Sequence, residues 1–450
     1  MKHEQKINLL AAAILAMAAI APAQAQKTRS LSLNEAIELS LQNSGKMKIA
    51  YAKADEANAG LHEAKDRRLP DLKVQGAYMR LNTPDVTLKL NTGSSQQQGG
   101  GEQSGGGTPK VDQVAYGMAT ATLPLFSGFR IKYGIESARY LEIAARLDAE
   151  KDREEVIQNT IEAYLNLYKA KRSVELVKEN LQREEKRVKD FGNLEQNGLM
   201  ARNDLLKAQL QQSNVELALM EAENNLKITN INMALQLGLP EDSDLIPDST
   251  GMEATPEAGS VAQWEQIALE QRKDRAALNA RINAANMGIK ATKGEYLPSV
   301  ALTGGYIGAD VPNLLTIPNA FNAGIGLQYN IAALWKTGAK LDAAKARLHQ
   351  AQATEGIIAD QVRLEVHHAY QGYLLSLKKI TVYKKSIEQA NENFRITKNK
   401  YDNNLVTTTD LLDADVAQLQ AQLNYAFSRA DAMLAYKKLQ RAAGVLGSNN

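Results

Sequence analysis

The hydrophobic pattern repeats every seven residues in two separate stretches of the chain. From about Asn203 to Leu237, two such rows read Leu205, Gln212, Leu219, Leu226 and Met233, and Ala208, Val215, Ala222, Thr229 and Gln236. In the closing stretch the row is made of small residues: Ala414, Ala421, Ser428, Ala435 and Ala442. A strict seven-residue period predicts helices that supercoil against their neighbours with a left-handed twist. The small residues of the row in the closing stretch would let that helix approach its neighbours closely.

A much longer helical pattern precedes each of these stretches. One runs from Arg130 to about Gln196 and would be on the order of 100 Å long, at about 1.5 Å per residue. The other resumes near Gly338 and ends at about Asp402. Turn signals separate each long helix from the shorter one that follows it, Asn197-Gly198 in the first case. The sequence therefore predicts two long antiparallel helical hairpins.

Four stretches alternate between apolar and polar residues in the manner of β-strands. They run from Asp71 to Leu81, from about Val111 to Phe126, from Ser299 to Gly308 and from Phe321 to Ile331. A glycine-rich polar loop at 91–108 separates the first two, and a loop with Pro312 and Pro318 separates the last two. Strands of about ten residues can cross a bilayer obliquely. Since four strands cannot close a barrel and lipid does not tolerate open sheet edges, several copies of the chain would have to share one barrel. The pattern alone is compatible with two, three or four copies.

Two pairs of shorter helices precede the strands. Ser32 and Glu35 form a capping-box pattern before a helix from Leu33 to Gln42, and a second helix is expected from about Lys46 to Arg68. The later pair is expected from Val261 to Arg272 and from Asp274 to Glu295.

The two halves of the chain are copies of one another. Asp204-Leu205-Leu206-Lys207-Ala208 returns as Asp410-Leu411-Leu412-Asp413-Ala414, at an offset of 206 positions (410 − 204). At the same offset Ala163-Tyr164 matches Ala369-Tyr370. The sequence thus predicts an internally duplicated α+β protein. Its expected parts are a signal peptide (1–25), a first repeat (26–240), a linker (241–260) and a second repeat (261–450).

The first residues have the features of a secretory signal. Lys2 and Lys6 precede an apolar run, and Ala23-Gln24-Ala25 fits an A-x-A cleavage site. No later stretch is apolar enough over about 18 residues to form a transmembrane helix. We therefore expect an exported protein.

The composition argues against enzyme chemistry and against nucleic acid as a partner. The chain has no cysteine, which excludes thiol catalysis and Cys-ligated metals, and its net charge is only +2. His367 and His368 are adjacent on a predicted helix, so they point about 100° apart and cannot share one metal. We expect no catalytic residues, no bound metal and no cofactor.

Taken in order, these features resemble the outer membrane efflux proteins, the TolC family. The resemblance covers essentially the whole mature chain. It rests on Leu31-Ser32-Leu33-Asn34-Glu35-Ala36-Ile37, on Leu69-Pro70 and Leu297-Pro298 ahead of strands, on Leu125-Phe126-Ser127-Gly128, and on the doubled D-L-L-x-A motif. It implies a homotrimer with a 12-stranded barrel in the outer membrane and a helical tunnel that extends into the periplasm. Such a channel is a passive conduit that docks to a periplasmic adaptor and an inner-membrane pump.

The resemblance also implies a periplasmic aperture. Asp410 and Asp413 match two aspartates that ring the mouth of the tunnel in the family, and a trimer would bring six carboxylates around one axis. The other interpretation is local, because an aspartate after Thr407-Thr408-Thr409 can simply cap a helix.

Two further sets of tip residues carry over from the family. Asp204 and Tyr401 match a latch that closes the tip, although Val406 and Thr407 stand where the family has an arginine. The segments expected to dock the adaptor contain Gly198, Leu199, Met200, Asn404, Leu405 and Val406. Ordinary inter-helix turns would account for these segments equally well.

A soluble periplasmic coiled-coil adaptor or scaffold is the competing interpretation. It would share the signal and the long helices, but it would not need four strands with one apolar face. Within the channel class, the sequence does not separate small-molecule efflux from type I protein secretion, and it identifies neither the substrate nor the pump.

Overall fold

A computed structural model describes residues 29–82, 111–248, 256–312 and 314–447. The expected signal peptide and the loop at 91–108 lie outside the described residues. The elements of the first repeat are β1 (Arg29–Leu31), α2 (Leu33–Asn43), α3 (Gly45–Asp66), β2 (Asp71–Arg80), β3 (Gln113–Phe126), α4 (Arg130–Gln196) and α5 (Arg202–Leu237). Those of the second are β4 (Leu245–Pro247), α6 (Val261–Gln271), α7 (Lys273–Lys293), the short 3₁₀ helix η1 (Gly294–Tyr296), β5 (Ser299–Val311), β6 (Leu315–Gln328), α8 (Ala333–Asp402) and α9 (Thr408–Ala442).

The chain divides into two compact units, and each unit takes segments from both repeats. One consists of the described parts of Met1–Ala52, Asp148–Arg275 and Ile357–Asn450. The other consists of the described parts of Lys53–Leu147 and Ala276–Gly356. The boundary between the two sequence repeats is therefore not the boundary between the two compact units. Each unit is built from corresponding segments of both repeats.

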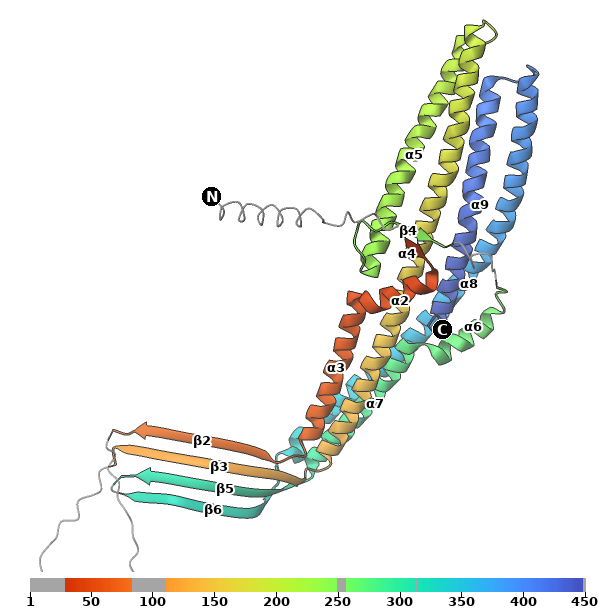
Figure 1. The fold of residues 1–450 in the computed structure, drawn as a ribbon. Coiled ribbons are helices and arrows are strands. Elements are labelled where there is room, and N and C mark those ends of the chain that lie inside the picture. The colour runs from red at the N-terminus through yellow and green to blue at the C-terminus, as the bar shows by residue number, and fades with distance from the viewer. Residues whose placement is uncertain (1–28, 83–110, 249–255, 313, 448–450) are drawn as a thin grey trace, which may run out of the picture. The chain divides into compact units, whose positions relative to one another are not determined.

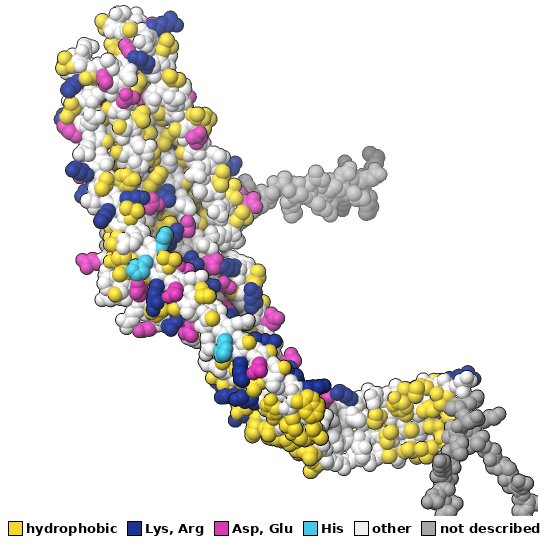
Figure 2. Space-filling model, turned by 180° about the vertical axis from the view of Figure 1, so that it is seen from behind, with side chains coloured by type: hydrophobic (Ala, Val, Ile, Leu, Met, Phe, Trp, Pro, Cys, Tyr) yellow, Lys and Arg dark blue, Asp and Glu magenta, His cyan; other side chains and the backbone are white. Residues whose placement is uncertain are grey.

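The second unit contains an antiparallel sheet with the strand order β2-β3-β5-β6 (Figure 1). Directly opposed residues share a face, so the register defines two chemically different faces. One face carries apolar and small side chains, among them Leu72, Val74, Tyr78, Ala119, Leu123, Leu302, Tyr306, Phe321, Ile325 and Leu327. The other carries Lys73, Thr120, Thr122, Thr303, Asn322 and Gln328. Figure 2 shows hydrophobic side chains gathered over one end of the sheet. The predicted alternation is confirmed.

The predicted limits of the last strand were wrong. The strand was expected from Phe321 to Ile331, with Pro318 in the loop before it, but β6 begins at Leu315 and ends at Gln328. Proline lacks an N–H donor and is tolerated at sheet edges and bulges. Pro318 meets both conditions, because β6 is an edge strand of this sheet and the β5–β6 register shifts between Ile307 and Ala309. The following helix α8 also begins before the expected Gly338, at Ala333.

The first unit is mostly helical, with the short paired strands β1 and β4, and its largest hydrophobic cluster lies where α4 and α5 pack with α2 and β1. Tyr164, Met233, Leu237 and Leu31 are at most 1% exposed. The Tyr164 hydroxyl lies 2.9 Å from the carbonyl oxygen of Leu31 and 2.8 Å from that of Asp248. Burial raises the pKa of this hydroxyl to about 12, so it remains a donor at physiological pH.

The duplication extends to this tyrosine contact. Tyr370, the counterpart of Tyr164, donates to the carbonyl oxygen of Gly259 at 3.0 Å. Leu31 and Gly259 each directly precede the N-cap serine of a short helix, Ser32 of α2 and Ser260 of α6. Each repeat thus anchors the start of a short helix to a tyrosine of a long one.

Two local expectations need correction. The hydroxyl of Ser32 accepts from the Glu35 N–H at 3.2 Å, but the Glu35 carboxylate pairs with Arg29, so the expected capping box is only half formed. The segment expected as a plain linker contains β4, which pairs in parallel with β1 from Arg29 to Leu31. Both corrections involve Arg29–Leu31, which was not predicted as a strand.

In the described part of the chain, no helix combines the length and the apolar character needed to cross a membrane.

Candidate functional site

The turns at the two hairpin tips have the same backbone structure. At the end of α4, the N–H of Gly198 donates to Glu195 at 2.9 Å and the N–H of Leu199 to Leu194 at 2.8 Å. At the end of α8, Asn404 donates to Tyr401 and Leu405 to Lys400, both at 2.9 Å. These bonds form Schellman motifs, which need a residue with positive φ. Gly198 has a φ of 73° and Asn404 a φ of 59°.

Each tip presents one leucine to solvent. Leu199 is 75% exposed and Leu405 is 73% exposed, although both are large apolar side chains. The neighbouring Met200 and Val406 are only half-buried. Of the predicted docking residues, Leu199 and Leu405 are therefore the accessible apolar ones, and exposed apolar side chains suit contact with another protein.

The second tip continues into a complete capping box at the start of α9. The hydroxyl of Thr407 accepts from the Asp410 N–H at 3.2 Å, and the Asp410 carboxylate accepts from the Thr407 N–H at 2.8 Å. Hydrogen bonds from the side chain and backbone of Thr407 lower the pKa of Asp410. The capping interpretation of Asp410 thus has a structural basis. Asp413 lies one turn further along, exposed, and makes no ion pair within the described residues.

The first tip lacks this cap. Ala201 occupies the N-cap position of α5 and makes no side-chain bond there. Asp204, the counterpart of Asp410, lies 3.5 Å from the ammonium of Lys207. Lys207 is itself the counterpart of Asp413, so the first copy forms an ion pair where the second has two carboxylates.

The structure does not join the predicted latch residues Asp204 and Tyr401 by a hydrogen bond. The Tyr401 hydroxyl lies 3.4 Å from the Thr408 hydroxyl instead, and its ring stacks on Phe191 with centroids 5.7 Å apart. Tyr401 and Phe191 belong to a hydrophobic cluster at the tip with Ala208, Leu411, Val188, Met200, Leu205 and Phe394. In this arrangement, apolar packing joins α4, α5, α8 and α9 near the tip.

A buried charged cluster between α4 and α9 was not predicted from the sequence. It consists of Asn180, Glu184 and Arg187 of α4 and Asp415 of α9. One signal existed in the repeats: the counterparts of Glu184, Arg187 and Asp415 at the 206-residue offset are Ala390, Asn393 and Gln209. The three charged residues thus have uncharged counterparts in the other repeat.

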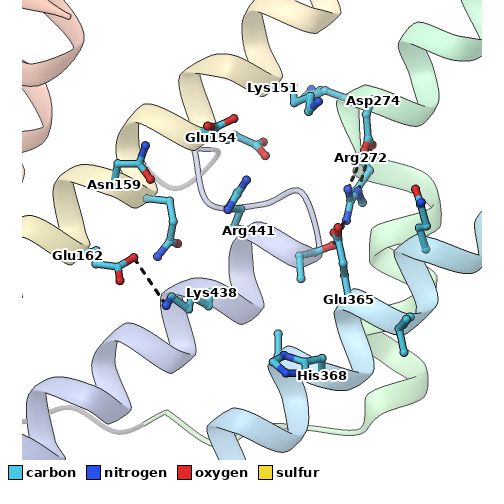
Figure 3. A pocket seen from close by; sticks show the side chains of 17 residues that line it. Lys151, Glu154, Asn159, Glu162, Arg272, Asp274, Glu365, His368, Lys438 and Arg441 are labelled. Atoms are coloured by element: carbon cyan, nitrogen blue, oxygen red, sulfur yellow. Dashed lines mark hydrogen bonds and ion pairs between the residues drawn. The ribbon is translucent and has the colours of Figure 1, made fainter. Parts of the chain in front are cut away.

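The helical unit also holds a polar cavity of about 830 Å³. Figure 3 shows its charged lining, which comes from α4, α7, α8, α9 and the residue between α6 and α7. Arg272 lies 2.6 Å from Asp274 and also contacts Glu365, and Lys438 lies 3.7 Å from Glu162. These pairs neutralise much of the lining.

The two adjacent histidines of α8 diverge as expected. His367 lies 2.5 Å from the Glu265 carboxylate, whereas His368 lines the cavity. Among the described residues, no three side chains of the metal-binding types are grouped as a metal ion would require.

The comparisons with known proteins agree with this architecture. The family model described as outer membrane efflux protein matches residues 36–239 and 264–445. The outer membrane efflux protein BepC of Brucella suis biovar 1 is 24% identical over 273 residues, which is 58% of this chain and 58% of BepC.

Solved structures share the fold over most of the chain. The CmeC outer membrane channel of Campylobacter jejuni aligns with a TM-score of 0.76 at 17% identity, covering 92% of this chain and 86% of CmeC. The outer membrane protein VceC of Vibrio cholerae aligns with a TM-score of 0.72 at 19% identity, covering 92% and 96%. At these identities the likeness establishes the fold. Because the family match spans both repeats and most of the chain, this protein belongs to the outer membrane efflux protein family.

Proposed function

We propose that this protein is the outer membrane channel of a tripartite efflux or type I secretion system. In this role it is a passive conduit, and an inner-membrane pump supplies the energy through a periplasmic adaptor. The family match supports this role. The strongest structural support is the four-stranded sheet, which has one apolar face. On that face Val74 is 87% exposed and Phe321 is 82% exposed in the single chain. Contact with lipid would remove this apolar surface from water.

The sheet also supports assembly with further copies. Its outer strands β2 and β6 each have one side without a partner strand. Bilayer lipid offers no hydrogen bonds to an open edge, so β2 of one copy would pair with β6 of the next. Three copies would give 12 strands, the barrel expected for a homotrimer.

Two exposed stripes on the long helices support the same assembly. On α5 the stripe contains Leu210, Leu217, Ile228 and Leu235, and on α8 it contains Ile357, Leu364, Leu375 and Val382. Both stripes have the spacing 7, 11 and 7, and their side chains are 54–70% exposed. Steps of seven and eleven keep a stripe on one side of a helix. We infer that these stripes pack against neighbouring copies in a helical tunnel.

At the periplasmic end, Asp410 and Asp413 would line the aperture, and Leu199 and Leu405 would contact the adaptor. A soluble coiled-coil adaptor, the alternative role, would leave the apolar sheet face without a partner. Membrane fractionation tests the choice. The channel should require detergent for extraction and migrate as a heat-modifiable oligomer, whereas an adaptor of this kind would stay in solution without detergent.

A further inference from the structure

Two buried carboxyl groups meet between α4 and α9. Glu184 and Asp415 are both 0% exposed, and both carboxyl groups contact the same guanidinium, that of Arg187. The two residues belong to different hairpins, since α4 is part of the first and α9 part of the second. Their contact is therefore a direct link between the hairpins.

The surrounding donors do not satisfy both groups as carboxylates. Arg187 places one guanidinium nitrogen 2.6 Å from Glu184 and another 3.4 Å from Asp415. Asn180 donates to Asp415 at 2.9 Å. Glu184 Oε2 and Asp415 Oδ1 are buried and accept no hydrogen bond, since the 3.4 Å contact of Asp415 Oδ1 with Arg187 is an ion pair only. A proton on one carboxyl would supply the missing donor between these groups.

Electrostatics place this proton on Glu184. Burial and the hydrogen bond to Asp415 raise the pKa of Glu184 to about 8. Burial opposes ionisation of Asp415 too, but the hydrogen bond with Glu184 and the charge of Arg187 hold its pKa below the usual value. The pair titrates as one unit.

A second arginine, Arg183, lies near the pair, and its Nε and Nη2 atoms are buried without a hydrogen-bond partner. On α4, Arg183 also acts on Asp415 through its charge. Nearby on the other two helices, Ala208 of α5 and Phe394 of α8 belong to the tip cluster, and Asn391 of α8 is bonded to Gln418 of α9.

We propose that Glu184 and Asp415 form a proton-sensitive junction between the two hairpins, which holds α9 against α4 while the pair keeps one proton and loosens when that proton leaves to solvent. Loss of the proton leaves two adjacent buried carboxylates, which repel each other and are poorly solvated. Because Asp415 follows Asp413 by two residues and Asp410 by five on α9, loosening would reach the aperture residues. The link to the aperture rests on the proposed channel function, whereas the junction itself does not.

The direction of the pH effect follows from linkage. Glu184 has an ordinary pKa of 4.5, raised to about 8 in the folded protein. Between these values the folded state holds more protons than the unfolded state, so stability falls as pH rises. The junction should be closed at pH 6 and weakened at pH 9.

A spin-label distance measurement tests the junction directly. The chain has no cysteine, so Gln182→Cys on α4 and Val416→Cys on α9, both at exposed positions, would be the only labelled sites. We expect the distance distribution to lengthen or broaden between pH 6 and pH 9, because the raised pKa of Glu184 places loss of the proton in this range. In Glu184→Gln, whose amide can donate to Asp415 at any pH, the distribution should stay at its pH 6 form. Equal distributions at both pH values in the labelled parent protein would overturn the proposal.

A matched control separates a local from a general effect of burial. Glu142 is another buried glutamate on α4, 7% exposed and paired with Arg146. Glu142→Gln in the labelled protein should keep the full pH response, and loss of the response there would also overturn the proposal. Currents across planar bilayers address the function separately. A pH-dependent distance in a protein that conducts no ions would support the junction and contradict the channel.

Discussion

The hydroxyl of Thr407 and the carboxylate of Asp410 each bond the backbone N–H of the other residue, and the first repeat has no equivalent pair. The second hairpin therefore starts its returning helix with a fixed cap, directly beside the proposed aperture. Asp410 caps the helix, and we propose that it also lines the aperture. Asp413 is exposed and does not belong to the cap, so the aperture is its only proposed role.

Removal of the cap should destabilise α9. Thr407→Ala removes the N-cap hydroxyl, and we expect a loss of about 1 kcal/mol in the free energy of unfolding. Urea denaturation followed by circular dichroism measures this loss. Ala201 already lacks a side-chain cap at the first tip, so Ala201→Gly serves as the control and should change stability much less. Equal losses in the two variants would contradict the assigned cap.

The same cap should depend on pH at the acidic end. The pKa of Asp410 lies below its usual value of 3.8, because Thr407 bonds the ionised carboxylate. A lowered pKa means that the stabilisation is present above the unfolded value and is lost as pH falls through the folded value. The stability difference between the natural protein and Asp410→Asn should therefore be constant from pH 7 to pH 5 and should shrink below about pH 4. A difference that grows on acidification would refute the cap.

Asp413 offers the cleaner test of the aperture. Asp413→Ala removes up to three carboxylates from the mouth of a trimer without touching the cap, and fewer carboxylates should bind multivalent cations more weakly. In planar bilayers we expect weaker block by a trivalent cation, and still weaker block when Asp410→Asn is added. Lys207→Ala, at the matching position of the first repeat, is the control and should leave the block unchanged. If block is the same in all variants, the aperture lies elsewhere.

The exposed tip leucines should be required for export and dispensable for assembly. Leu199→Glu and Leu405→Glu place a charge in an apolar docking surface, so the adaptor should no longer bind and export should be lost. Crosslinking to the adaptor and a drug-susceptibility assay measure the two effects, while native electrophoresis checks the trimer. Ile49→Glu, which places the same charge at another exposed apolar position, on α3 (59% exposed), should export normally. Full export by both tip variants would rule out docking through these leucines.

The two faces of the sheet should respond differently to charge. Ile325→Lys places an ammonium on the apolar face of β6, where insertion into lipid would become less favourable by roughly 2–4 kcal/mol near the membrane centre. Asn322→Lys places the same charge on the opposite face and should be tolerated. The yield of heat-modifiable oligomer in the membrane fraction measures both. Equal yields would mean that the apolar face does not meet lipid.

Much of the fold follows from local sequence signals. Gly198 marked the first hairpin turn, and the two tips fold alike because Asn404 can also adopt the positive φ that Gly198 provides. The small-residue row on α9 was expected to be a packing surface, and Ala414, Ala421, Ser428 and Ala442 are indeed buried. These features depend on residues close together in the chain.

Contacts between distant segments could not be predicted in the same way. In the sequence, Glu184 and Asp415 look like the many other charged residues of their helices. They come together only because of the way α4 packs against α9. The same holds for Tyr401, whose ring stacks on Phe191, whereas the family resemblance had suggested Asp204 as its partner. For Pro318, the deciding fact was that β6 is an edge strand, a property of the whole sheet.

Single-channel recording tests the central claim most directly. Protein extracted from the membrane in detergent is added to a planar bilayer, and the current is followed with and without a trivalent cation. An outer membrane channel with an acidic aperture predicts discrete, stable conductance steps that the cation blocks from the aperture side. A protein that stays in solution without detergent and gives no steps would contradict the account.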